Sequence, residues 1–428
     1  MNIAILTNFQ DLNLGYSLIG IALDQSRMLL EQGHKVFFFT SEQFNPGHND
    51  EAGANDIFEH KNFVLENKSK FMHLVDYQSK VAFSIEHFQE KDQAAEIYVD
   101  HFVENDIHIV FTHDFIFTGW NLPFAEAVKV ASGALMKIDF PVKWLHWIHS
   151  VPSGNRDWWN IQDYPGDHTI VFPNRTEKTR VMESFRAAPD QIFPIPHIKD
   201  IRKWYDFCPE AWGFTRMFPQ IMSAAVSQIY PCSSDRLEAK QLDTVIRIFG
   251  FMKKAGMQVF LCAANQWATG KQSKENIQEY IKLAVKSGLE PGKDFVFTSE
   301  ISKRFQNGIS QRMIRDLQLL QNLFIFPTRE ESFGLVGPEA AYSGCLVVSN
   351  RDLVMMYEVI GNYAPAYHFG SHHQNSPDSK DDKWLMAVAN SILARIFMNE
   401  AIMTKTYCRT RYNMTHLYEK YYLPAMSR

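Results

Sequence analysis

Cysteine is scarce in this chain of 428 residues. The five cysteines are Cys208, Cys232, Cys262, Cys345 and Cys408, and no two of them form a Cys-x-x-Cys pair. This spacing argues against a zinc ribbon. A sparse and odd set favours a reducing compartment, in which the cysteines serve as small apolar side chains.

Long hydrophobic runs and an excess of charge of one sign are also lacking. No run approaches the roughly 18 apolar residues of a transmembrane helix, and residues 2–7 are too short for the apolar region of a signal peptide. Lys and Arg number 43 against 48 Asp and Glu, a formal net charge of −5, so the overall field does not attract nucleic acid or an anionic membrane. We therefore expect a cytoplasmic protein with no transmembrane anchor.

The sequence contains a repeated alternation of strand and helix patterns. Residues 2–7 predict a buried strand, residues 18–31 a helix that ends before Gly33, and residues 34–40 a second strand. Further strands are predicted at 107–112, 142–148 and 169–172, with a helix at 175–185. Such alternation is typical of a parallel sheet with right-handed crossovers.

The pattern lapses over residues 201–224, where Pro and Trp residues predict an interdomain connection. It then resumes, with strands predicted at 225–230, 257–263, 294–298, 323–326 and 346–348. Helices are predicted at 242–254, 276–287 and 311–321, at a segment that includes 339–343, and at 384–398 and 401–421. The predicted fold class is therefore α/β, with two open, mostly parallel sheets in succession.

The most specific segment is residues 327–340, which lie between a predicted strand and a predicted helix. Gly334 and Gly337 allow the backbone to approach a ligand closely. A helix that begins near residue 335 directs free N–H groups and its positive end toward an anion such as a diphosphate. Glu331 and Glu339 flank this turn, and a carboxylate can accept hydrogen bonds from two hydroxyls of a diol.

This Glu-x7-Glu segment resembles the signature of retaining glycosyltransferases of the GT-B fold, specifically glycosyltransferase family 4. The resemblance continues over residues 341–350 and to Glu358, and Gly33-His34-Lys35-Val36 resembles the family's Gly-His-Glu-Val. It covers most of the chain in outline. It implies two Rossmann-like domains facing across a cleft: an acceptor-side domain at 1–205 and a nucleotide-sugar-binding domain at 206–400. A helix within 401–428 would cross back to the first domain.

The same resemblance implies roles for matching residues of the second domain. Glu339 would hold the ribose hydroxyls and Glu331 the transferred sugar, while the backbone N–H groups of Phe333, Gly334 and Leu335 would hold the sugar and diphosphate.

Five further residues are candidates for contacts near the diphosphate or the donor sugar. Lys240 and Arg236 match the family's diphosphate-clamping pair, although here they stand four positions apart and Gln241 replaces a glycine. In the first domain, Gly15 would approach the diphosphate and His149 the donor sugar. His113 is a weaker candidate of the same kind.

The implied reaction moves a sugar from a nucleotide diphosphate sugar, with a UDP-sugar favoured, to an acceptor hydroxyl with retention. Glu331, His149 and Lys240 are the candidate catalytic residues. No Asp-x-Asp motif stands where a GT-A enzyme needs one, so we expect no metal, and no cofactor besides the donor co-substrate.

The acceptor stays open between a glycan, a small molecule, a protein and a modified nucleic acid. One alternative is a phage-type glycosyltransferase that acts on hydroxymethylated DNA bases, which calls for a basic cleft face. Another is a non-catalytic nucleotide- or glycan-binding protein on the same fold. Turnover of a nucleotide sugar distinguishes them.

Overall fold

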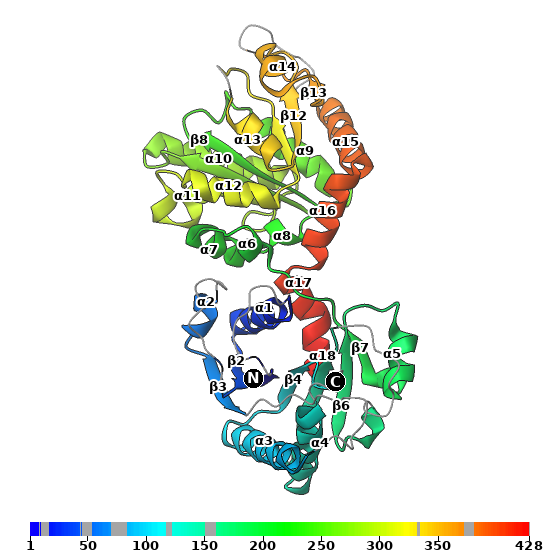
Figure 1. The fold of residues 1–428 in the computed structure, drawn as a ribbon. Coiled ribbons are helices and arrows are strands. Elements are labelled where there is room, and N and C mark those ends of the chain that lie inside the picture. The colour runs from blue at the N-terminus through cyan, green and yellow to red at the C-terminus, as the bar shows by residue number, and fades with distance from the viewer. Residues whose placement is uncertain are drawn as a thin grey trace. The chain divides into compact units, whose positions relative to one another are not determined.

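The computed structural model describes residues 1–7, 9, 17–42, 44, 54–69, 84–116, 122–149, 160–331, 334–371 and 381–427. Gly15 and Phe333, both predicted donor contacts, lie outside these residues. The chain divides into two compact units (Figure 1). The first unit comprises Met1–Asp200 and Met414–Arg428, and the second comprises Ile201–Asn413.

The first unit is built on a parallel sheet with the strand order β3-β2-β1-β4-β5-β6-β7. The strands are β1 (Asn2–Leu6), β2 (Lys35–Ser41), β3 (Phe63–Ser69), β4 (Ile109–His113), β5 (Lys143–Trp147), β6 (Asp167–Phe172) and β7 (Ile192–Pro194). Strand order reverses between β1 and β4, and ligands of open α/β sheets bind where the order reverses. His113 stands at this edge, at the end of β4.

Helices supply the apolar cover of this sheet. They are α1 (Ser17–Glu31), α2 (Asn55–Phe58), α3 (Ile85–Glu104), α4 (Leu122–Lys137), α5 (Lys178–Phe185), α17 (Met414–Leu417) and α18 (Leu423–Ser427). The C-terminal segment packs on this unit, where the Tyr422 ring lies 5.5 Å from Phe111 and 5.8 Å from Trp147. The Tyr418 hydroxyl lies 2.7 Å from His34 Nε2.

The second unit contains two three-stranded parallel sheets, ordered β10-β9-β8 and β11-β12-β13. The strands are β8 (Val226–Ser233), β9 (Val259–Gln266), β10 (Phe295–Phe297), β11 (Leu323–Phe326), β12 (Leu346–Asn350) and β13 (Ala366–Tyr367). Amide side chains join β8 to β11: Gln228 Nε2 donates to the Ile325 carbonyl at 3.0 Å, and its Oε1 accepts from Ile325 N at 2.9 Å. A buried glutamine thus replaces part of a strand ladder.

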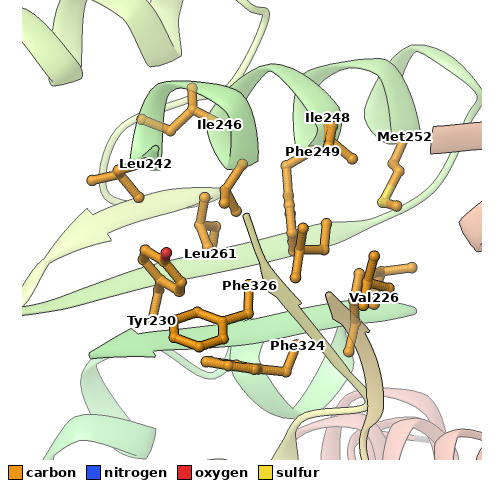
Figure 2. Close-up of a cluster of buried hydrophobic side chains, with 14 of the residues drawn as sticks. Val226, Tyr230, Leu242, Ile246, Ile248, Phe249, Met252, Leu261, Phe324 and Phe326 are labelled. Atoms are coloured by element: carbon orange, nitrogen blue, oxygen red, sulfur yellow. The ribbon is translucent and has the colours of Figure 1, made fainter. Parts of the chain in front are cut away.

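The core of the second unit gathers between these strands and the helices that cover them. The longer helices are α9 (Leu242–Lys254), α10 (Lys271–Lys286), α12 (Gln311–Leu320), α15 (Asp382–Met398) and α16 (Glu400–Arg411), and the shorter ones include α11 (Thr298–Ile301), α13 (Val336–Tyr342) and α14 (Met355–Ile360). Figure 2 shows Phe249 of α9 turned toward the strands that carry Tyr230, Phe324 and Phe326, and Leu242 and Ile246 of the same helix belong to the same cluster. Because these buried side chains hold β8 and β11 in place, they also fix the starting points of the loops that follow the two strands.

Residues 201–224 are not a linker, which corrects the sequence-based prediction. They form α6 (Ile201–Trp204), α7 (Pro209–Met217) and α8 (Gln220–Ser223), all in the second unit. Pro209 occupies the first position of α7 and Pro219 caps α8. Proline at a helix start costs no hydrogen bond, so these prolines begin helices where the pattern suggested breaks.

The predicted helix over 401–421 is helical for most of its length but is interrupted at residues 412–413, because α16 ends at Arg411 and α17 begins at Met414, followed by a π-helical turn at Tyr418–Tyr422. The Asn413 side chain donates at 3.0 Å to the carbonyls of both Arg409 and Thr410, and so closes α16. The chain rejoins the first unit from Met414, whereas the prediction placed a boundary at 400.

The α/β fold class, with two units built on mostly parallel sheets, is confirmed. Among the described helices, none alone is long and apolar enough to cross a membrane. The pair Asp382–Met398 and Glu400–Arg411 meets the length and composition criteria together, with a bend of 86° between them.

Candidate functional site

The loop after β8 places Lys240 at the carboxyl edge of the strands. The Tyr230 hydroxyl donates to the Lys240 carbonyl at 2.6 Å. The next residue, Gln241, has φ of 52°, in the left-handed region that favours glycine. Its Nε2 donates to the Phe369 carbonyl at 3.0 Å and to the Pro327 carbonyl at 2.5 Å. A side chain that ties two loops together therefore stands where the family resemblance places a glycine.

The loop after β11 lies against the Lys240 loop. Arg329 N donates to the Ala239 carbonyl at 2.9 Å. Asn350, buried at the end of β12, donates from Nδ2 to the Thr328 carbonyl at 2.9 Å and to the Gly370 carbonyl at 2.6 Å. These bonds satisfy backbone groups that a buried loop would otherwise leave unpaired, and they hold residues 327–331 in one conformation.

Two ion pairs join the two loops. Lys240 Nζ contacts Glu331, with both side chains largely buried at 13% and 15% exposure. Arg236 contacts Glu330, and this pair is more open at 43% and 47%. The structure therefore brings together three of the predicted site residues, Lys240, Arg236 and Glu331, and adds Glu330, which the sequence reasoning missed.

The pKa of Lys240 is lowered to about 8, chiefly by burial and then by the positive charge of Arg236, while Cys232 and Glu330 act in the opposite direction. The ammonium also lies 5.5 Å from the centre of the Phe326 ring. A cation held in these surroundings gains from any additional negative charge that approaches it.

The turn at Gly334 requires glycine. Its φ is 75°, and a Cβ there would lie 3.0 Å from Phe326 Cε1 and 3.5 Å from Glu331 Cγ. Leu335 follows, with 63% of its surface exposed. The α13 helix has only seven residues, too few for its N-terminus to be an anion site by itself, and Lys240 and Arg236 are the cations that an anion would meet.

Glu339 lies in the first turn of α13, partly buried. Its Oε1 accepts a long hydrogen bond of 3.4 Å from Gln311 Nε2, at the start of α12. The two carboxylates of the Glu-x7-Glu segment thus face different partners: Glu331 faces the Lys240 cation, and Glu339 faces a neutral amide.

The first unit brings His113 and His149 into direct contact. His113 Nδ1 lies 2.9 Å from His149 Nε2, and His149 Nδ1 lies 3.1 Å from His197 Nε2. Both ring nitrogens of His149 are therefore occupied by other imidazoles. Burial lowers the pKa of His113 to about 3 and that of His149 well below its usual value.

His197 was missed by the sequence reasoning. It follows β7, a three-residue strand that ends at Pro194, and the strand prediction did not include it. The available signal was a histidine after a short apolar run, the same arrangement as at His113 and His149.

The side chains of the described ranges include no group of three or more His, Cys, Asp or Glu placed to hold a metal ion. All five cysteines are free, and Cys208, Cys232 and Cys262 are buried. Burial raises the pKa of the Cys232 thiol to about 12, which keeps it in the unreactive protonated form.

No family model and no curated protein sequence matches this chain. Among solved structures, it is similar to a glycosyltransferase from Rickettsia africae at 11% identity, covering 99% of this chain and 95% of that one with a TM-score of 0.33. It is also similar to a sucrose-phosphate synthase from Thermosynechococcus elongatus at 16% identity, with coverage of 100% and 96% and a TM-score of 0.32. A third is a UDP-GlcNAc 2-epimerase from Neisseria meningitidis, at 11% identity, full coverage of both chains and a TM-score of 0.32. TM-scores of this size do not establish a function for this chain.

Proposed function

We propose that this protein is a retaining glycosyltransferase whose second unit binds a nucleotide diphosphate sugar, with a UDP-sugar favoured. The observation that carries the proposal is the pairing of Lys240 with Glu331 and of Arg236 with Glu330 at the carboxyl edge of β8 and β11. Ligands of open α/β sheets bind at this edge.

The four charged groups suit the two halves of such a donor. Lys240 and Arg236 are two neighbouring cations, which match the charge of a diphosphate. Glu331 lies on the opposite loop, where its carboxylate can accept hydrogen bonds from sugar hydroxyls. When a diphosphate arrives, it replaces Glu331 as the partner of Lys240 and frees that carboxylate for the sugar.

The negative charge that develops on the diphosphate during transfer of the sugar determines the roles that we assign to the charged residues. Breaking the bond between sugar and diphosphate leaves negative charge on the diphosphate, and preorganised cations stabilise such a transition state. Lys240 and Arg236 supply this stabilisation, so the reaction needs no divalent metal. We assign Glu339 to the ribose hydroxyls, because the described partner of its carboxylate is the neutral amide of Gln311, whereas Glu331 faces the Lys240 cation.

Thermal unfolding with UDP, GDP, ADP and their sugars, each with and without EDTA, tests the donor site. A ligand at 100 times its Kd adds about 2.7 kcal/mol to the free energy of unfolding. That increase raises the Tm of a unit near 200 residues by roughly 5–10 °C. We expect one base to give this shift, the shift to survive EDTA, and Lys240→Ala and Glu339→Gln to abolish it.

Lys293→Ala is the matched control, because Lys293 pairs with Glu290 on the exposed surface of the same unit. We expect it to leave the shift unchanged. Failure of every nucleotide to raise the Tm of the unmodified protein would refute the donor site. A shift without turnover of any nucleotide sugar would leave a nucleotide-binding protein instead of an enzyme.

A further inference from the structure

A groove in the second unit brings together three cations from two helices. It has a volume of about 390 Å³ and lies between α9, α10 and the start of α15. Arg247 and Lys254 of α9, Lys286 of α10 and Asp382 of α15 are among the residues that line it. Binding sites for small molecules have volumes from about 300 Å³ upward, so the groove has room for one small ligand.

This groove is separate from the site at Lys240. The α9 and α10 helices connect parallel strands, so they run from the carboxyl edge of the sheet back to its amino edge. Lys254 is the last residue of α9, and Lys286 is the last residue of α10. The 13 residues of α9 span about 20 Å, which places both lysines at the opposite edge from Lys240.

Cations outnumber carboxylates at this end of the groove. Arg247 Nη2 donates to Asp382 Oδ1 at 2.6 Å, whereas neither Lys254 nor Lys286 forms an ion pair with any residue that the structure describes. The pKa of Asp382 is lowered chiefly by the hydrogen bond from Arg247, against the opposing effect of desolvation. The charges of Lys254 and Lys286 lower it too. One carboxylate therefore faces three positive charges, an excess of two.

Asp243, a second carboxylate that lines the groove, does not remove this excess. It stands in the first turn of α9, at the other end of the helix from Lys254, which is about 16 Å away along the helix axis. The excess of positive charge therefore stays at the Lys254 end.

The charge of a phosphate monoester, about −1.5 to −2 at pH 7, matches this excess. The favourable interaction of lysine with a helix dipole accounts for one lysine at each carboxyl end, but it does not require the two helix ends to meet beside Arg247. We propose that the groove binds a small soluble phosphate monoester, such as a sugar phosphate, and that Lys254 and Lys286 hold its phosphate group.

Other residues of the groove suit the rest of such a ligand. Ser287 follows Lys286, and its hydroxyl can donate to a phosphate oxygen. Phe251 and Leu283 are partly buried and supply an apolar wall for the carbon atoms of the ligand. The Lys254 ammonium lies 5.1 Å from the centre of the Phe251 ring, so the cation stands beside that wall.

Calorimetric titration with inorganic phosphate and with glucose 6-phosphate tests the groove. A phosphate can also bind at Lys240, so each titration is repeated in Lys240→Ala, where we expect glucose 6-phosphate still to bind. Lys254→Gln and Lys286→Gln should each weaken that binding about tenfold or more, the effect of losing a hydrogen bond between two charged groups. Lys253→Gln is the matched control, because it removes the same charge from the same helix end, but Lys253 pairs with Asp294 outside the groove.

Chemical acetylation read by mass spectrometry locates the ligand in the unmodified protein. Saturating glucose 6-phosphate should protect Lys254 and Lys286, but not Lys282, which is exposed on α10 and does not line the groove. Unchanged acetylation of both lysines would overturn the proposal. Binding of glucose 6-phosphate that disappears in Lys240→Ala would overturn it as well.

The source of the phosphate and the independence of the two sites are tested separately. Inorganic phosphate that binds as tightly as glucose 6-phosphate would overturn the assignment to a monoester. Binding of vesicles that contain phosphatidylinositol 4-phosphate, without binding of glucose 6-phosphate, would overturn the soluble source. Because the groove does not include Lys240, a protein that binds no nucleotide but binds glucose 6-phosphate at Lys254 would refute the donor site and support this proposal.

Discussion

Gly250 lies where α9 crosses the end of α10, and we predict that Gly250→Ala destabilises the second unit. A Cβ built at this position would lie 2.9 Å from Ser287 Cβ, and the Ser287 carbonyl oxygen would be closer still. The obstacle is backbone at a helix end, since Ser287 N donates to the Leu283 carbonyl at 2.9 Å. It cannot move aside as a flexible side chain would, so the two helices must separate.

Two opposing effects set the magnitude. Forcing an extra methyl group into a packed core costs about 1–3 kcal/mol. Replacing a helical glycine by alanine returns about 0.5–1 kcal/mol. We therefore expect a net loss of about 1–2 kcal/mol, or a fall in Tm of roughly 2–8 °C for a unit of this size.

Thermal unfolding of Gly250→Ala against Gly213→Ala isolates the contact. Gly213 lies within α7 of the same unit, and a Cβ there would meet nothing within 4 Å. It should therefore show only the favourable helix effect, with a small rise in Tm. Equal shifts in the two variants would refute the argument that close helix packing, and not helix propensity, governs position 250.

Three further predictions concern stability and loop order. Burial raises the pKa of Asp114 from 3.8 to about 6, so the folded protein binds this proton more tightly than the unfolded chain and stability falls as pH rises between these values. Asp114→Asn should then add up to about 3 kcal/mol above pH 6 and nothing near pH 3 in denaturant titrations. Arg409→Met should cost about 2–4 kcal/mol, because Arg409 donates to the carbonyls of Ile221, Met222 and Ala224 at 2.7–2.8 Å, and Arg409→Lys should recover part of that loss. Gln241→Gly should change the free energy of unfolding by no more than about 1 kcal/mol, since relief of the left-handed backbone offsets two lost hydrogen bonds. It should nevertheless weaken nucleotide binding measured by calorimetry.

Several strands and helices of the second unit could be predicted from the sequence pattern. The strands predicted at 323–326 and 346–348 and the helix predicted at 242–254 are present, the second strand running on to Asn350, because unbroken apolar runs and a 3.6-residue period mark buried elements. Position alone placed Lys240 and Glu331 after such strands, and the carboxyl ends of parallel strands meet at one edge. Their common edge was therefore predictable, but their direct ion pair was not predicted.

Other features depended on contacts between distant residues. The pairing of Arg236 with Glu330 joins positions 94 apart in the chain, and no local pattern selects Glu330 over its neighbours. The prolines of residues 201–224 conceal a helical period, because proline starts a helix as readily as it interrupts one.

The sequence by itself determined the α/β class, the alternation of parallel strands and helices in both halves, and the loops that bear the charged residues. Periodicity and glycine placement are local properties of the sequence, so they can be recognised without knowing which distant residues come into contact. Tertiary structure alone decided which side chains meet. His149 contacts both His113 and His197, because these rings follow β4, β5 and β7, whose ends come together only after the sheet has formed.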